Sequence, residues 1–254
     1  MLHYRNKAKY LVLYLKKGFI MKLNILLTCA TVTSAMMFIP VTGFSQDTSG
    51  TNVIESAEGT QGAVAQAAMA QDLYAYGVAN KNAISALAAA QIMMSLDIED
   101  VEREMENKPT EGADVTETGE GVDAPADGKM MLASAREFAG DDATLLGLID
   151  DAEAEGARGR MGGASRTLSR LRAGRTDIFK VPFYGNSLAE LAIIGDGDAD
   201  LDLLVTDANG NTMCLDRSYS DKLYCSWTPA WDGYFFVAVK NMGRIRNSYY
   251  ILTN

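Results

Sequence analysis

The last quarter of the chain, residues 195–254, constrains the fold more than any other stretch. It opens with GDGDADLDLLVTDANGN, in which Leu201, Leu203 and Val205 share one face of an alternating pattern. A period of two predicts a β-strand with one buried side, and DANG supplies turn residues that tolerate positive φ. Similar alternation returns at 235–239 and 249–251. Short strands between turn signals at this spacing predict a β-sandwich.

The order of these signals resembles the bacterial pre-peptidase C-terminal (PPC) family of secreted domains. The motifs are GDGDADLDLLVTDANGN followed by WTPAWDGYFFVAVKN, and the similarity covers about Thr176–Asn254. The resemblance implies a jelly-roll type antiparallel β-sandwich over 176–254. It also implies a non-catalytic accessory role, in a family in which some members bind calcium or polymeric substrates.

The first 45 residues have the features of a secretory signal peptide. They contain six basic residues and no acidic one, followed by the apolar run Leu23–Ile39 and then Pro40. Gly43 and Ser45 are small residues at the −3 and −1 positions of a cleavage site before Gln46. Met21 is an alternative start. We therefore expect a periplasmic or secreted bacterial protein with no membrane span after cleavage.

Cleavage would leave a chain without histidine, because His3 is the only one. This argues against Ser-His-Asp, Cys-His and histidine-ligated zinc chemistry. Cys214 and Cys225 would be the two remaining cysteines in an oxidising compartment. A hairpin folded at Tyr219-Ser220 would place them opposite each other, so we predict a disulfide within that hairpin. The net charge of −10 argues against nucleic acid as a partner, because it repels a phosphate backbone.

Residues 60–155 predict a small alanine-rich helical domain. Ala63, Ala67, Ala70 and Tyr74 fall on one helical face, and Gly77 is expected to end that helix. A third helix is expected from the stripe Ile98, Val101 and Met105, and an acidic solvated loop over 107–128. The predicted helix-capping residues are Asn80 or Asn82, Asp127, and Asp141 or Asp142.

Two segments are expected to lack regular structure. Residues 46–59 are rich in Ser, Thr and Gly and predict a disordered leader. Residues 156–175 contain six arginines and no acid, interleaved with Gly, Ser and Ala, and predict a flexible linker; docking onto an anionic surface is the alternative. The predicted fold class is therefore an α+β two-domain chain, helical first and sandwich second.

A set of alternating aspartates is the candidate metal-binding group in the sequence. Such carboxylates can converge on Ca²⁺, which takes six to eight oxygen ligands. An EF-hand is excluded because Leu201 stands where that loop needs glycine. The alternative, which we favour, is that the carboxylates shape turns and bond to backbone amides. The candidate calcium ligands are Asp196, Asp198, Asp200, Asp202 and Asp207.

Aromatic residues near the C-terminus could contact a ligand or a protein partner. Trp227 and Tyr234 are expected in the core, and Tyr219 and Trp231 in exposed turns. The resulting hypothesis is an exported, non-enzymatic binding or scaffolding protein whose partner is an envelope or extracellular protein or a polysaccharide. One alternative is a calcium-dependent adhesion or matrix component. The other is a hydrolase using carboxylates, for example Asp150, Asp151, Glu153 and Glu155.

Overall fold

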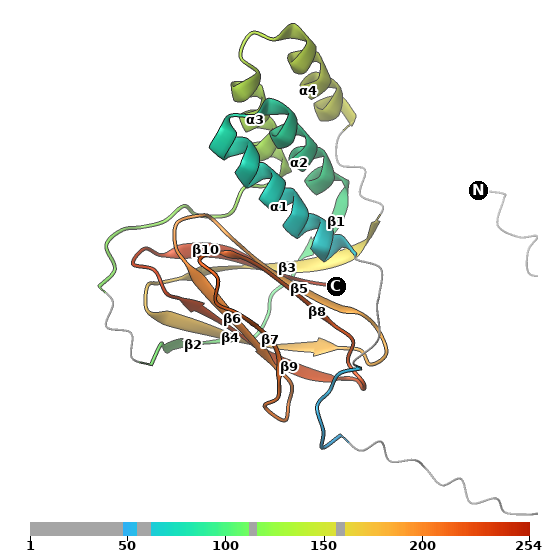
Figure 1. Ribbon diagram of the computed structural model, residues 1–254, viewed down its shortest axis with the longest axis vertical. Coiled ribbons are helices and arrows are strands. Elements are labelled where there is room, and N and C mark those ends of the chain that lie inside the picture. The colour runs from blue at the N-terminus through green and yellow to red at the C-terminus, as the bar shows by residue number, and fades with distance from the viewer. Residues whose placement is uncertain (1–47, 55–61, 112–115, 156–160) are drawn as a thin grey trace, which may run out of the picture. The chain divides into compact units, whose positions relative to one another are not determined.

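Two five-stranded sheets and four helices make up the part of the chain that the computed structural model describes, residues 48–54, 62–111, 116–155 and 161–254 (Figure 1). The predicted signal peptide lies outside these residues. The helices are α1 (Ala63–Asn80), α2 (Ala83–Ser95), α3 (Gly128–Ala139) and α4 (Ala143–Glu155). None of them is long and apolar enough to cross a membrane.

The predicted caps of three helices are confirmed. Asn82 Oδ1 accepts a hydrogen bond from the amide of Ser85 at 2.9 Å, and Asp127 Oδ1 accepts from Met130 at 2.8 Å. Asp142 Oδ1 accepts from the first turn of α4 in the same way. The end of α1 differs from the prediction, because the helix passes Gly77 and stops at Lys81, which adopts the left-handed conformation (φ 48°). Alanines fill the helix contacts, so the helices approach closely; the fully buried ones are Ala67, Ala70, Ala86, Ala89, Ala90 and Ala135.

The two sheets form the predicted sandwich. Strands β3 to β10 are ordered β3-β10-β5-β8 and β4-β9-β6-β7, the jelly-roll arrangement of eight strands in two sheets. β1 and β2 add one strand to each, and all pairs are antiparallel except β1 with β3. Sheet A comprises β1 (Leu96–Asp100), β3 (Met161–Leu171), β10 (Asn247–Thr253), β5 (Ala189–Gly195) and β8 (Lys222–Trp227). Sheet B comprises β2 (Met105–Pro109), β4 (Arg175–Phe183), β9 (Gly233–Asn241), β6 (Leu201–Thr206) and β7 (Thr212–Asp216).

The main core lies between the sheets and follows the alternation read from the sequence. Leu201, Leu203 and Val205 of β6 point inward and are fully buried, as are the inward residues of β9. Trp227 packs against Phe183 and Phe235, with ring centroids 5.0 and 5.2 Å apart. Burial of these aromatic rings supplies much of the driving force for closing the two sheets.

The prediction of a third helix is wrong, because residues 96–100 form β1 and residues 105–109 form β2. Two partner strands decide this local conformation: β1 pairs with β3 and β2 with β4. Arg103, in the connection between β1 and β2, donates hydrogen bonds to the hydroxyl groups of Ser165, Thr167 and Thr253. The segment between the two helical hairpins therefore belongs to the sandwich.

The expected linker at 156–175 is also wrong where the structure describes it. Residues 161–171 form β3, and Arg175 begins β4. The arginines have structural partners: Arg166 bonds Asp100 at 2.6 Å and lies over the ring of Tyr250, and Arg175 Nε donates to Asn107 Oδ1. Small hydroxyl residues alternate with Arg and Leu over residues 165–170 (SRTLSR) with the period of a strand, which the Arg- and Gly-rich composition obscures.

The acidic loop is exposed over most of its described residues, as expected, but residues 107–109 belong to β2 and the loop backbone is bonded to the sandwich. Thr118 donates to the carbonyl oxygen of Arg244, and Gly119 forms a bridge with Ile245. A side chain at Gly121 would collide with the carbonyl oxygen of Arg246, so this close approach needs glycine. The loop thus runs along the end of the sheets, beside the turn between β5 and β6.

The first two turns of helix α1 pack on the outer face of sheet A. Ala63, Val64 and Ala67 pack on Ala192 and Ile194 of β5, with contributions from β3 and β10. At the start of the helix, both carboxylate oxygens of the buried Glu190 accept from the amide of Gly62, at 2.9 and 3.0 Å. The hydroxyl group of Tyr224 donates to the same carboxylate. The helices and the sandwich therefore share a packed interface.

Candidate functional site

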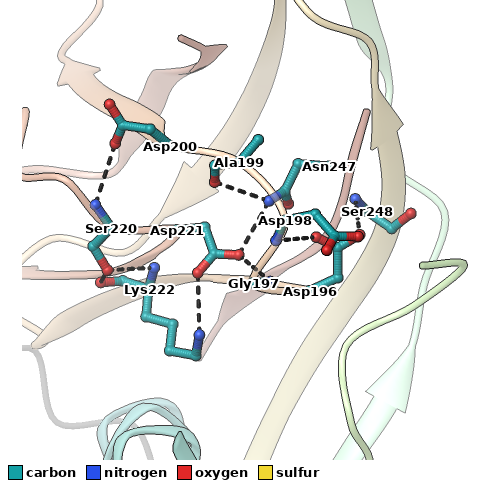
Figure 2. A network of polar contacts seen from close by, with 10 residues as sticks. All are labelled: Asp196, Gly197, Asp198, Ala199, Asp200, Ser220, Asp221, Lys222, Asn247 and Ser248. Atoms are coloured by element: carbon teal, nitrogen blue, oxygen red, sulfur yellow. Dashed lines mark hydrogen bonds and ion pairs between the residues drawn. The ribbon is translucent and has the colours of Figure 1, made fainter. Parts of the chain in front are cut away.

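The turn between β5 and β6 holds three of the five candidate calcium ligands (Figure 2). Asp196 accepts from the amides of Asp198 and Ser248, at 3.1 and 2.8 Å. Asp198 Oδ2 accepts from the amide of Val122 in the acidic loop at 2.7 Å. Asp200 Oδ1 accepts from the amide of Ser220 at 3.2 Å. Each carboxylate thus bonds to backbone amides, as the favoured interpretation expects.

Asp221 is a fourth carboxylate of this network that the sequence reasoning missed. It is buried and accepts hydrogen bonds from the amide of Gly197, from Asn247 Nδ2 and from Lys222 Nζ, the last two at 3.1 Å (Figure 2). A Cβ at Gly195 would collide with the Asp221 side chain. No local sequence pattern marks this contact, because β6 and β7 separate the two residues in the chain.

Burial raises the pKa of Asp196, with further contributions from the charges of Asp198 and Asp221. Asn247 Oδ1, buried in the same network, accepts no hydrogen bond from the described residues. Among those residues, no three or more His, Cys, Asp or Glu side chains are grouped so that they could hold a metal ion. Calcium binding at this turn stays a prediction from the sequence.

The other two candidate ligands lie elsewhere in sheet B. Asp202 is on β6 opposite Lys240 of β9, and burial raises its pKa. Asp207, in the turn after β6, accepts from the amides of Asn52, Asn209 and Asn211 and from Asn211 Nδ2. Burial opposes ionisation of Asp207, but these four hydrogen bonds outweigh it and lower its pKa. The five aspartates therefore occupy three separate environments.

The aromatic predictions have mixed outcomes. Tyr219 is 98% exposed and Trp227 is buried, as expected. The prediction that Tyr234 lies in the core is wrong. Its side chain points to the outer face of sheet B, where Lys180 Nζ lies 4.2 Å from its ring centroid. Trp231 is half-buried, and its backbone bonds with the side chain of Asn52.

A disulfide joins Cys214 and Cys225, with a Cα–Cα distance of 6.2 Å. The hairpin expected around it is wrong. Cys214 is on β7 of sheet B, whereas Cys225 is on β8, which pairs with β5 of sheet A. The bond therefore ties the two sheets together where both have an edge strand.

The acids considered for hydrolysis lie on an exposed face of α4. Asp150 and Glu153 both bond to Arg136, at 2.7 and 3.0 Å, and all three side chains are exposed. Asp151 is exposed as well. An arginine shared by two solvated carboxylates is a surface ion-pair network, whereas glycosidase chemistry needs two acids facing across a cleft.

Comparison with protein-family models and with curated proteins found no match. Among solved structures, the chain is similar to the pre-peptidase C-terminal domain of collagenase from Bacillus anthracis. The two are 4% identical with a TM-score of 0.24, and the alignment covers 62% of this chain and 95% of that one. This is the type of domain that the sequence motifs of residues 176–254 resemble.

Proposed function

We propose that the protein is an exported, non-catalytic binding module that uses the outer face of sheet B. The observation that carries the proposal is that this face, unlike that of sheet A, has no helix packed on it among the described residues, yet presents apolar side chains. We call it the uncovered face and define it by Ile178, Leu204, Leu215, Phe236 and Ala238.

Strand register places these residues in a continuous row. Ile178 pairs with Ala238, Ala238 with Leu204, and Leu204 with Leu215, so the row crosses four neighbouring strands. Phe236 lies two residues before Ala238 on the same face of β9 and is 39% exposed. Leu215 is 51% exposed. An apolar row of this length on one side of a sheet is typical of a surface that another molecule covers.

A shallow hollow of about 390 Å³ lies on the uncovered face. The small side chain of Ala238 leaves the space, and Phe236, Leu204 and Ile178 border it together with the polar Thr206, Glu106 and Lys108. An apolar centre with a polar border is the usual anatomy of a binding surface. The hollow is open and shallow, which favours a large partner such as a polymer or a protein.

The disulfide and the buried carboxylates support export and a non-catalytic role. A disulfide between two sheets suits an oxidising compartment. The buried carboxylates of Glu190 and Asp207 are engaged by backbone amides, and Asp177 is engaged by Asn107, Ser169 and Tyr249. These groups stabilise the fold, so assigning them to catalysis would remove hydrogen bonds on which the packing depends.

The test is co-sedimentation with an insoluble cell-envelope fraction, before and after the fraction is treated with protease. We expect Phe236→Ser to lower the bound fraction at least about fivefold, because a central aromatic side chain contributes strongly to binding. Tyr184→Ser, at an exposed position in the connection between β4 and β5 and outside the uncovered face, is the matched control and should bind like the parent. Loss of binding after protease treatment identifies a protein partner, and retention identifies a polysaccharide. Equal binding by Phe236→Ser and the parent, or no binding by the parent, would overturn the proposal.

A further inference from the structure

Residues Thr48–Ile54, expected to be disordered, are instead bound at one end of the sandwich (Figure 1, blue). The segment forms no strand and follows bends. It contacts the turn after β6 and the connection between β8 and β9, both of which are far from it in the sequence. We call the residues that hold it the cradle: Asp207, Asn209, Asn211, Thr228 and Trp231.

Asn52 is the centre of this contact and is 3% exposed. Its side chain bonds both backbone polar groups of Trp231: Nδ2 donates to the carbonyl oxygen, and Oδ1 accepts from the amide, each at 3.0 Å. Its own amide donates to Asp207 Oδ2 at 3.0 Å. A carboxamide with both ends satisfied is a specific contact, since aspartate would lose the donor and alanine would lose both bonds.

The flanking residues are held by different means. Asn209 Nδ2 donates to the carbonyl oxygens of Thr48 and Gly50, at 2.7 and 2.9 Å. Val53 packs against the main core of the sandwich, and the amide of Ile54 donates to the carbonyl oxygen of Thr228 at 2.8 Å. The segment is therefore held by side-chain hydrogen bonds to its backbone, by one buried carboxamide and by one apolar side chain.

We propose that the cradle is a peptide-binding site and that it also accepts Thr48–Ile54 of a second copy of the chain, which links the two copies. The occupant is defined by the structure, since every copy carries the segment that fits. Without an occupant, the backbone groups of Trp231 that face Asn52 would lose their partners and the core beside Val53 would be uncovered. This inference is independent of the uncovered face of sheet B.

The chain's own segment competes with any segment from another copy. Because it is tethered, its effective concentration is on the order of millimolar, so a free peptide gains access only when the tethered contact is weakened. A variant of the segment that keeps the cradle intact therefore reveals the site. Asn52→Ala in the full chain is such a variant, since it removes two hydrogen bonds from the occupant and none from within the cradle.

The experiment measures binding of a fluorescent peptide covering residues 46–56 to the full-length protein by anisotropy. We expect Asn52→Ala to bind the peptide about 10-fold or more tightly than the parent does, because the fraction of free cradle rises. A peptide with alanine in place of Asn52 should bind at least about 10-fold more weakly to the same variant. Adding Asn209→Ala to the protein should weaken peptide binding too, because this side chain bonds the segment and leaves the turn's backbone bonds in place.

Val53→Ala is the second variant, for use if Asn52→Ala lowers the melting temperature below the assay temperature. It removes only part of the apolar contact and should also increase peptide binding. Native mass spectrometry of the parent at high concentration should detect linked copies, and a chain that lacks residues 46–54 should form none. The proposal is overturned if the folded variants bind the peptide no more tightly than the parent. It is also overturned if both variants lose cooperative melting, because the segment would then be an integral part of the fold.

Discussion

The outer faces of the two sheets differ although each sheet has five strands. Sheet A presents Ala164, Ala192 and Ile194, and α1 packs on them. Sheet B presents Leu204 and Phe236 toward solvent. Small residues on sheet A let a helix approach, whereas larger, mixed residues on sheet B leave a hollowed surface. One sheet has its cover within the chain, and we propose that the other receives a cover from a partner.

The difference is visible in two strands of similar length. Every residue of β5 (AELAIIG) is buried, as in a strand covered on both sides. β6 (LDLLVT) alternates between buried and half-buried residues, as in a strand covered on one side. A continuous buried run therefore indicates that both faces of its sheet are covered within the chain. An alternating strand indicates that one face is open to solvent or to a partner.

The largest expected effect compares truncations on the two faces. Ile194→Ala removes buried atoms under α1 and should lower the free energy of unfolding by about 2–5 kcal/mol. Leu204→Ala on the uncovered face should cost less than about 1 kcal/mol, because the side chain already contacts solvent. Urea unfolding monitored by circular dichroism measures both. Similar losses would mean that the face of sheet B is covered in solution.

The second prediction concerns the bond between the sheets. Replacing Cys214 and Cys225 by alanine should lower stability by about 2–3 kcal/mol, because the bond closes a short loop in the unfolded chain. Hydrogen exchange should then increase more in β7 than in β8, since β8 belongs to the sheet that α1 covers. A thiol count on the denatured, unreduced protein should give no free Cys214 or Cys225. Two reactive thiols there would contradict the disulfide.

A third, smaller effect is expected at the carboxylate that fastens α1. Glu190→Gln weakens the charge-assisted bonds to Gly62 and should cost about 1–2 kcal/mol, with faster amide exchange at the start of α1. Glu106→Gln is the matched change in sheet B, where Glu106 pairs with Lys108 in solvent at 2.9 Å. It should change stability by less than about 0.5 kcal/mol. Equal effects would show that Glu190 is not the fastening point.

The sequence predicts elements that local pattern determines. The caps at Asn82, Asp127 and Asp142 need only neighbouring amides, and the strands of 176–254 follow from alternation and turn residues. β1, β2 and β3 could not be assigned because their conformation depends on pairing with each other and with β4 and β10. The contacts at Asp221 and Asn52 are missed for the same reason, since their partners are distant in the sequence.

The smallest expected effect is confined to acidic pH and concerns two aspartates whose pKa values shift in opposite directions. Hydrogen bonds to Asp207 lower its pKa in the folded state. Its contribution to stability is therefore present above the pKa of the unfolded chain, about 3.9, and is lost as pH falls through the lower folded value. Asp196 has a raised pKa, so its ionisation lowers stability as pH rises between about 3.9 and that raised value.

Melting temperatures measured from pH 2.5 to 6 test the direction of both pKa shifts. Asp207→Asn should flatten the fall in stability below about pH 4, because the variant has no proton to bind at that position. Asp196→Asn should remove the opposing slope at slightly higher pH. Since Asp207 also holds Asn52, the Asp207→Asn variant should show faster exchange in Thr48–Ile54, whereas α1 on the covered face of sheet A should be unaffected. Matching pH profiles for parent and Asp207→Asn would show that the four hydrogen bonds do not lower the pKa of Asp207.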